Sequence, residues 1–167
     1  MKLKAFTIIE LVIVIITVSI LAFVSAVAIG NAMKGIQLNN AADKLASDLR
    51  YAQTMAQGTG VWYGISIEAN PVNQYTIYTT TGTIDTVVQN PAKIGSLFIV
   101  NLLNDYRTRI SSVEIAGGNK VEFNPLGIPY SDKLESAISS EGVITLVIDS
   151  TSKTVRITPN TGRVYIQ

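Results

Sequence analysis

The first part of the chain is a long apolar segment with few interruptions. From Leu11 to Ile29 the residues are apolar apart from three hydroxyl side chains, those of Thr17, Ser19 and Ser25. At about 1.5 Å per residue a helix over this segment is ~28 Å long, close to the ~30 Å thickness of bilayer hydrocarbon. The hydroxyls can donate to carbonyls in the preceding turn, so they do not exclude such a helix. The segment therefore predicts a membrane-spanning helix.

A second helical pattern follows, with apolar residues recurring every three or four positions over residues 41–56. The residues of this stripe are Ala41, Leu45, Leu49, Ala52 and Ala56. Between the two helical patterns lie Gly30 and Gly35, each of which weakens a helix by about 1 kcal/mol relative to Ala. They predict a bend or a melted stretch. The Gly-Thr-Gly of residues 58–60 predicts a C-cap that ends the helix.

Beyond Gly60 apolar and polar residues alternate in short runs, which is the pattern of half-buried strands. The predicted strands are residues 61–67, 75–78, 120–123, 143–148, 154–158 and 163–166. The last three are separated by turn sequences at 149–152 and 159–162, which favours an antiparallel meander. Residues 96–103 fit a buried strand or a short helix, and we favour a strand. The order of elements predicts an α+β fold, in which a long N-terminal helix packs on an antiparallel β-sheet headpiece.

Composition removes several classes of function. The 167 residues carry 13 Lys+Arg and 12 Asp+Glu, so the chain lacks the basic charge of a typical nucleic-acid-binding domain. Cys and His are absent, which excludes a disulfide framework, thiolate metal sites and the commonest general base. We predict no catalytic residues, no metal site and no cofactor, and we expect the chain not to be an enzyme.

One ionisable residue lies at the start of the apolar segment. Glu10 is the sole charged residue between Lys4 and Lys34. A charged side chain in hydrocarbon costs about 2.5–3.5 kcal/mol on insertion scales, so it normally has a partner or a function. Lys2 and Lys4 precede the segment, which predicts a cytoplasmic N-terminus and places the rest of the chain across the membrane.

Two general hypotheses fit the apolar segment. One is an uncleaved membrane anchor. The other is a secretory signal cut after Ala28, since residues 26–28 (Ala-Val-Ala) form a small-x-small site. Against the second, the segment is at or beyond the roughly 7–15 apolar residues usual for such a signal, and Glu10 has no use in a discarded peptide.

A third hypothesis comes from residues 4–16, KAFTIIELVIVII, which resemble the prepilin signature of type IV pilins and type II secretion pseudopilins. The resemblance implies cleavage by prepilin peptidase after Ala5 and N-methylation of Phe6. It also implies that Glu10 pairs with the N-terminal amine of a neighbouring subunit. Ala5 stands where the family usually has Gly, and we expect slower processing from it. The implied parts are a leader (1–5), a transmembrane helix (6–29), an amphipathic continuation (30–57) and a β-rich headpiece (58–167).

A second resemblance covers residues 42–53, ADKLASDLRYAQ, and the C-terminal run from Ile144 to Val164. Both are similar to H-class pseudopilins and FimT-type minor pilins. This implies a pilin-like structural subunit of a type IV pilus or a type II secretion pseudopilus. Such a subunit crosses the bacterial inner membrane once, with its headpiece in the periplasm or outside. The implied partners are the inner membrane, other pilin or pseudopilin subunits, and prepilin peptidase.

DNA is an alternative partner, because some FimT-type relatives are linked to DNA uptake through arginines near the C-terminus. Here Arg163, with Arg156 and Lys153 on the neighbouring predicted strand, would supply the contacts if the hairpin forms. Tyr165 occupies the place of a second arginine of the relatives. DNA affinity depends on several phosphate contacts, so two or three cations support only weak binding.

Overall fold

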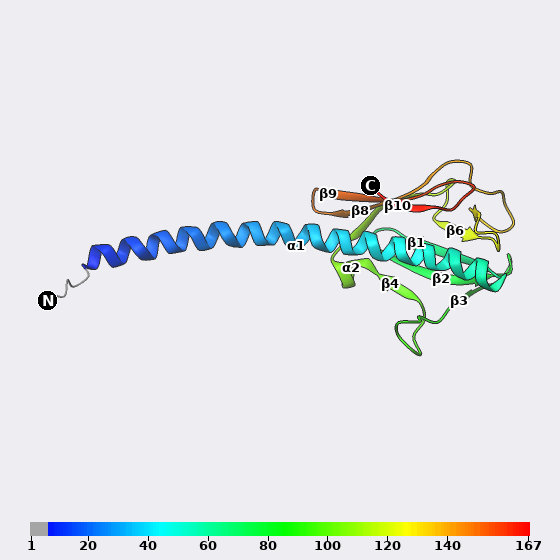
Figure 1. Ribbon diagram of the computed structural model, residues 1–167, viewed down its shortest axis with the longest axis horizontal. Helices are drawn as coiled ribbons and strands as arrows, with labels where there is room; N and C mark the ends of the chain where they lie inside the picture. Colours follow the sequence, from blue (N-terminus) through cyan, green and yellow to red (C-terminus); the bar gives the residue numbers. More distant parts are fainter. Residues whose placement is uncertain (1–6) are drawn as a thin grey trace. The chain divides into compact units, whose positions relative to one another are not determined.

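The computed structural model describes residues 7–167 and confirms the predicted α+β fold, in which a long helix packs on antiparallel β-sheets (Figure 1). The chain divides between Ile36 and Gln37 into two compact units. We call them the N-terminal unit and the C-terminal unit, and the strands all belong to the second.

The long helix, α1, spans Ile8–Thr59 without a break at Gly30 or Gly35, so the predicted melted stretch is wrong. Extending a helix adds one hydrogen bond for each residue fixed, whereas a break leaves unpaired groups at two new helix ends. The free-energy cost of these unpaired groups exceeds the cost of placing two glycines within a helix. The predicted C-cap is confirmed: Gly60 has φ +71°, and its N–H donates to the carbonyl of Ala56 at 3.1 Å.

Short strands and one more helix follow α1. Their bounds are β1 Trp62–Glu68, β2 Gln74–Thr80, β3 Asp85–Val87, β4 Ile99–Asn101, α2 Leu102–Tyr106, β5 Arg109–Glu114, β6 Lys120–Phe123, β7 Pro129–Tyr130, β8 Gly142–Ile148, β9 Thr151–Ile157 and β10 Val164–Ile166. The six predicted strands correspond to β1, β2, β6, β8, β9 and β10. Residues 96–103 contain both predicted alternatives, because β4 runs directly into α2.

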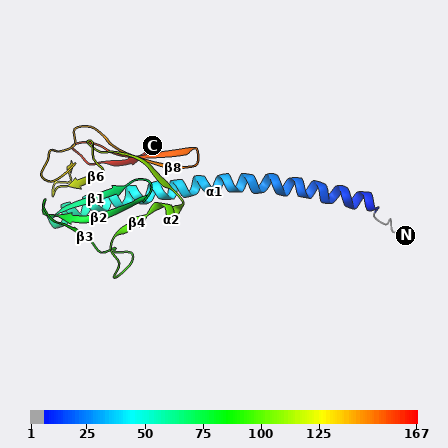
Figure 2. The same ribbon diagram turned by 180° about the vertical axis from the view of Figure 1, so that it is seen from behind.

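The strands form two antiparallel sheets. The first has the order β3-β2-β1-β6-β7, and β4 pairs with the part of β2 that β3 leaves free. The second has the order β10-β9-β8-β5. Its β8–β9 and β9–β10 pairs are the predicted meander. Figure 2 shows the two sheets from the opposite side, with the later part of α1, which belongs to the C-terminal unit, running along them.

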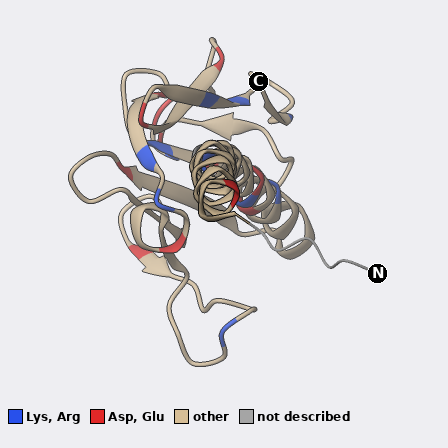
Figure 3. Cartoon of the chain, turned by 90° about the vertical axis from the view of Figure 1, so that its left-hand side faces the viewer, with Lys and Arg blue, Asp and Glu red and all other residues tan. Residues whose placement is uncertain are grey.

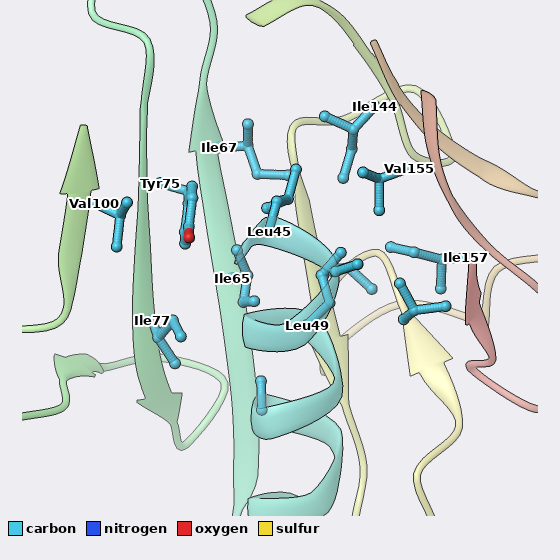
Figure 4. Close-up of a cluster of buried hydrophobic side chains, with 14 of the residues drawn as sticks. Leu45, Leu49, Ile65, Ile67, Tyr75, Ile77, Val100, Ile144, Val155 and Ile157 are labelled. Atoms are coloured by element: carbon cyan, nitrogen blue, oxygen red, sulfur yellow. The ribbon is translucent and has the colours of Figure 1, made fainter. Parts of the chain in front are cut away.

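The core of the C-terminal unit forms around α1. All five residues of the predicted apolar stripe, from Ala41 to Ala56, are fully buried. Figure 4 shows Leu45 and Leu49 between side chains of both sheets, Ile65 and Ile67 on one side and Ile157 on the other. Burial of a Leu side chain contributes about 1.5–3 kcal/mol. The helix is therefore the element that joins the two sheets into one core.

A carboxylate inside this core also attaches α1 to the first sheet. Asp48 is 5% exposed and accepts hydrogen bonds from the Lys44 ammonium and from the Tyr75 hydroxyl, each at 2.6 Å. Burial and the adjacent Asp48 raise the pKa of Tyr75 well above its usual value, so the hydroxyl stays protonated and donates. Asp48 is not one of the residues of the predicted apolar stripe, and its burial was not predicted.

Two polar side chains of α1, those of Arg50 and Gln53, bind backbone carbonyls beyond β6. The Gln53 amide donates to the carbonyls of Gly127 and Thr161 at 2.8 and 2.9 Å, and Arg50 donates to the carbonyl of Val164 at 2.9 Å. These contacts need a residue without a side chain at Gly162, which has φ +64°. A Cβ there would lie 2.5 Å from the Gln53 amide nitrogen and 2.6 Å from the Gly127 carbonyl.

We expect Tyr75→Phe to lower the free energy of unfolding by about 1.5–3 kcal/mol, the usual worth of a buried hydrogen bond to a charged group. Thermal unfolding of the detergent-solubilised chain, followed by circular dichroism, measures the change. Tyr63→Phe is the matched control, because Tyr63 is also buried and its hydroxyl bonds to no other residue among 7–167. Equal stability of both variants would contradict the role given to the Asp48–Tyr75 bond.

We expect Gly162→Ala to destabilise the C-terminal unit more than Gly95→Ala. Both glycines have positive φ, so each substitution costs about 1–2 kcal/mol in backbone strain. A Cβ at Gly95 would meet no atom within 4 Å, whereas crowding at Gly162 adds about 1–3 kcal/mol. The same unfolding measurement compares the two, and an equal loss would show that the close approach is not needed.

Candidate functional site

The N-terminal unit presents apolar side chains on every face of α1. Ile8 is 85% exposed and Phe23 72% exposed, and an 18-residue window of the helix has a mean hydropathy of 3.0 with none of it buried. A helix that is apolar all round is stable in an apolar solvent. Among residues 7–167, α1 is the one helix long and apolar enough to cross a membrane.

The hydroxyl side chains of this segment bond within the helix, as expected. Thr17 donates to the carbonyl of Val14 at 2.9 Å, and Ser19 donates to that of Ile15 at 2.8 Å. The Ser25 hydroxyl donates one turn back in the same way. Polar groups in a bilayer must be satisfied internally, and these three are.

The start of α1 is fixed by Thr7. Its carbonyl accepts from the N–H of Leu11 at 3.3 Å, and its hydroxyl oxygen accepts from the N–H of Glu10 at 3.3 Å. Because the helix begins at Ile8, Thr7 is the N-cap. The Thr-x-x-Glu spacing of a capping box is visible in the sequence, and our reading of the sequence did not use it.

The carboxylate of Glu10 is not bonded within the part of the chain that the structure describes. Its side chain is exposed in the first turn of α1, and no hydrogen bond or ion pair reaches the carboxylate from residues 7–167. The positive end of the helix dipole favours an acid at this position. Ala5 and Phe6 lie outside the described residues, so the pairing expected between Glu10 and the N-terminal amine stays a prediction.

The structure does not bring the three C-terminal cations onto one face. The hairpin of β9 and β10 forms, but Lys153 and Arg156 are three residues apart on β9 and so point to opposite sides of the sheet. Lys153 pairs with the buried Leu146, whereas Arg156 pairs with Val143 on the other face. Figure 3 shows basic and acidic segments interspersed among the strands.

Arg156 is also held by an acid. Its guanidinium donates to the Glu141 carboxylate at 2.9 Å, and the Tyr165 hydroxyl donates to the same carboxylate at 2.6 Å. These two hydrogen bonds, that of Tyr165 first, lower the pKa of Glu141. Tyr165, which stands where the relatives have a second arginine, therefore has a structural role, because its hydroxyl binds the carboxylate that holds Arg156. Of the three basic residues, only Arg163 is exposed, whereas Lys153 and Arg156 are half-buried.

The hollows of the C-terminal unit are small. A volume of about 220 Å³ is lined by Lys120, Ser131, Asp132, Glu135 and a glycine turn, and Lys120 is paired with Asp132 and Glu122 there. Within residues 7–167 no group of three or more acidic, His or Cys side chains is placed to hold a metal ion.

Comparison with known families identifies the family of this chain. A family model described as "Type II transport protein GspH" matches residues 41–162, well over half of the chain. The chain belongs to the GspH family. This family consists of minor pseudopilins of type II secretion, which are structural and not enzymatic. The match confirms the resemblance inferred from residues 42–53 and from the C-terminal run.

Solved structures show the same pilin-like fold. The minor pseudopilin EpsH of the Vibrio cholerae type 2 secretion system is 11% identical, with a TM-score of 0.58, over 78% of this chain and 96% of EpsH. The type IV minor pilin FimU of Pseudomonas aeruginosa is 13% identical, with a TM-score of 0.51, over 78% of this chain and 87% of FimU. No curated protein sequence matches this GspH-family chain.

Proposed function

We propose that this minor pseudopilin is cut by prepilin peptidase between Ala5 and Phe6, is N-methylated on Phe6, and joins a pseudopilus through Glu10. Glu10 carries the proposal, because it is an acid at the start of a helix whose apolar surface is exposed on every side. Its partners are other pseudopilin subunits, the peptidase and the inner membrane. The C-terminal unit lies on the periplasmic side.

Glu10 favours assembly because of the cost of an isolated charge in lipid. Cleavage after Ala5 creates a positive amine on Phe6, four residues before Glu10. An unpaired carboxylate in hydrocarbon costs about 2.5–3.5 kcal/mol on insertion scales, and pairing with an amine relieves that cost. A subunit that offers its amine to the acid of a neighbour lowers the energy of both. The assembled state is thereby favoured over the free subunit.

The functional parts follow from the same reasoning. Residues 1–5 are the leader, 6–29 cross the membrane, 30–57 continue the helix, and 58–167 form the β-rich headpiece. The division between compact units falls later, after Ile36, because packing of α1 against the sheets begins at Leu38. The segment from residue 30 to residue 36 thus belongs to the helix without belonging to the core.

The alternatives receive less support from the geometry. A cut after Ala28 would divide α1 within its continuous span and discard Glu10 together with its cap. A direct DNA contact would depend on Arg163, because Lys153 lies on the other face of its sheet and Arg156 is bound by Glu141. One exposed cation supplies little of the phosphate neutralisation on which DNA affinity depends.

The first experiment is an intact-mass measurement of the mature chain from its native host. We expect the mass of a chain that begins at Phe6 and carries one added methyl group. A chain that begins at Ile29 would instead establish the secretory-signal alternative, and a chain that retains Met1 and assembles normally would refute processing.

We expect Glu10→Val to leave membrane insertion intact, since it makes the segment more apolar, and to reduce incorporation into the pseudopilus by about tenfold or more. Co-purification with partner subunits from crosslinked membranes measures incorporation. Thr17→Val is the matched control, because it removes a polar group from the same helix without removing a charge. Recovery of Glu10→Val at the wild-type yield would refute the role of the acid.

A further inference from the structure

Two arginines that the proposed function does not use lie together on the C-terminal unit. Arg107 follows α2 and Arg109 begins β5, and both side chains are exposed. Within residues 7–167 neither guanidinium donates a hydrogen bond or forms an ion pair. Both line one hollow of about 240 Å³, whose other lining residues are Leu103, Val147, Ile148 and Asp149. The hollow therefore carries two positive charges and one negative charge, which favours an anion.

The backbone on both sides of the two arginines is anchored in the core. Thr108, which separates them, is fully buried, and its N–H donates to the carbonyl of Leu102 at 3.1 Å. Asn73 is also fully buried, and it accepts the N–H of Leu102 on its carbonyl and the N–H of Ile110 on its side-chain oxygen, each at 2.9 Å. Residues 107–109 are thus held at the hollow without a ligand, and this lowers the entropy cost of binding one.

Arg107 has a backbone conformation that favours glycine. As the residue that ends α2 it is left-handed, with φ 55° and ψ 24°. Glycine is the usual residue in this conformation, because a Cβ makes it less stable. The substitution Arg107→Gly therefore removes a charge while it relieves the backbone, so a loss of binding can be separated from a loss of folding.

The hollow lies at the end of the C-terminal unit that the chain enters from its apolar segment. Both Figure 1 and Figure 2 show α2 and the turn between β8 and β9 at the same end of this unit as its first turns of α1. Eight residues of α1 lead from Ile29 to Gln37, a length of ~12 Å at the helical rise. The headgroup layer extends about 5–8 Å beyond the hydrocarbon, which leaves a gap that a long side chain can cross.

We propose that Arg107 and Arg109 bind the phosphate of an anionic phospholipid on the side of the membrane where the C-terminal unit lies. A guanidinium presents several N–H donors in one plane, which suits the oxygens of a phosphate. Leu103, 37% exposed, adds apolar surface for the part of the lipid next to the phosphate. This inference rests on the proposed membrane span, and it depends neither on cleavage after Ala5 nor on Glu10.

The test measures lipid binding to the full-length chain in detergent by native mass spectrometry. Phosphatidylglycerol carries a net negative charge, whereas phosphatidylcholine has the phosphate without a net charge. We expect phosphatidylglycerol to bind more tightly. We expect Arg107→Gly and Arg109→Gln each to weaken its binding about fivefold, the usual contribution of one cation near an anionic lipid surface.

Lys93→Gln is the matched control. Lys93 is also an exposed cation whose side chain bonds to none of residues 7–167, and it lies outside this hollow. We expect its loss to leave the affinity for phosphatidylglycerol unchanged. An equal loss in Lys93→Gln would show a general effect of net charge and overturn the proposal. Circular dichroism establishes that each variant is folded, and Arg109→Gln tests the site independently of the backbone at residue 107.

Other outcomes would assign the arginines to a different ligand. Equal affinity for the two lipids would overturn the preference for an anion. Soluble glycerol phosphate that binds as tightly as phosphatidylglycerol would show an anion site without a role for the membrane. If Arg107→Gly keeps its lipid affinity but no longer co-purifies with partner subunits, the arginines bind an acidic protein surface instead. Each of these results overturns the proposal.

Vesicle flotation distinguishes this inference from the membrane span on which it rests. If the full-length chain does not float with phosphatidylcholine vesicles, the proposed span fails, and the lipid site fails with it. If the chain floats and the arginine variants bind phosphatidylglycerol as the wild type does, only the lipid site fails.

Discussion

The structure depends on how the apolar surface of one helix is covered. Leu45 and Leu49 are fully buried between two sheets, whereas Leu11 and Leu21 on the same helix are 56% and 67% exposed. Exposure of the second pair to water costs roughly 25 cal/mol of free energy for each Å² of apolar surface. The C-terminal unit covers its half of α1 by folding, and the N-terminal unit needs lipid or other helices. This division explains how a single helix can supply the centre of a packed core and also, as we propose, a membrane span.

Buried polar contacts then determine how the elements pack. Asp48 accepts from Tyr75, and Glu122, 1% exposed, accepts from Tyr78 at 2.8 Å; both tyrosines lie on β2. The first bond attaches β2 to α1 and the second attaches it across β1 to β6. A buried acid that loses its partner is costly, so a shifted register would be penalised at both places. Tyr78 also lies across Gly64, where a Cβ would meet the aromatic ring.

The sequence predicted the parts of the fold whose signal is periodic and local. The stripe from Ala41 to Ala56, the cap at Gly60 and six strands were all readable because each follows from spacing or turn chemistry. The missed elements, β3, β5 and β7, are short or are completed by distant partners, and residues 96–103 were predicted only as a strand or a helix. The burial of Asp48 was unreadable for the same reason, because its partner Tyr75 is 27 residues away. Of the candidate site, Thr7 was readable from the Thr-x-x-Glu spacing, whereas the binding of Arg156 by Glu141 was not.

The first turn of α1 and the buried core occupy different parts of the chain. Glu10 and Thr7 contact only the first turn of α1 within residues 7–167, while every side chain of the buried core lies beyond Ile36. Effects at such distant, unshared sites add independently. We therefore expect mutations at the start of α1 to leave the core intact, and mutations in the core to leave the carboxylate of Glu10 unaffected. If Glu10 pairs with the amine of a neighbouring subunit, as we propose, this separation matters, because the buried core forms without using that acid.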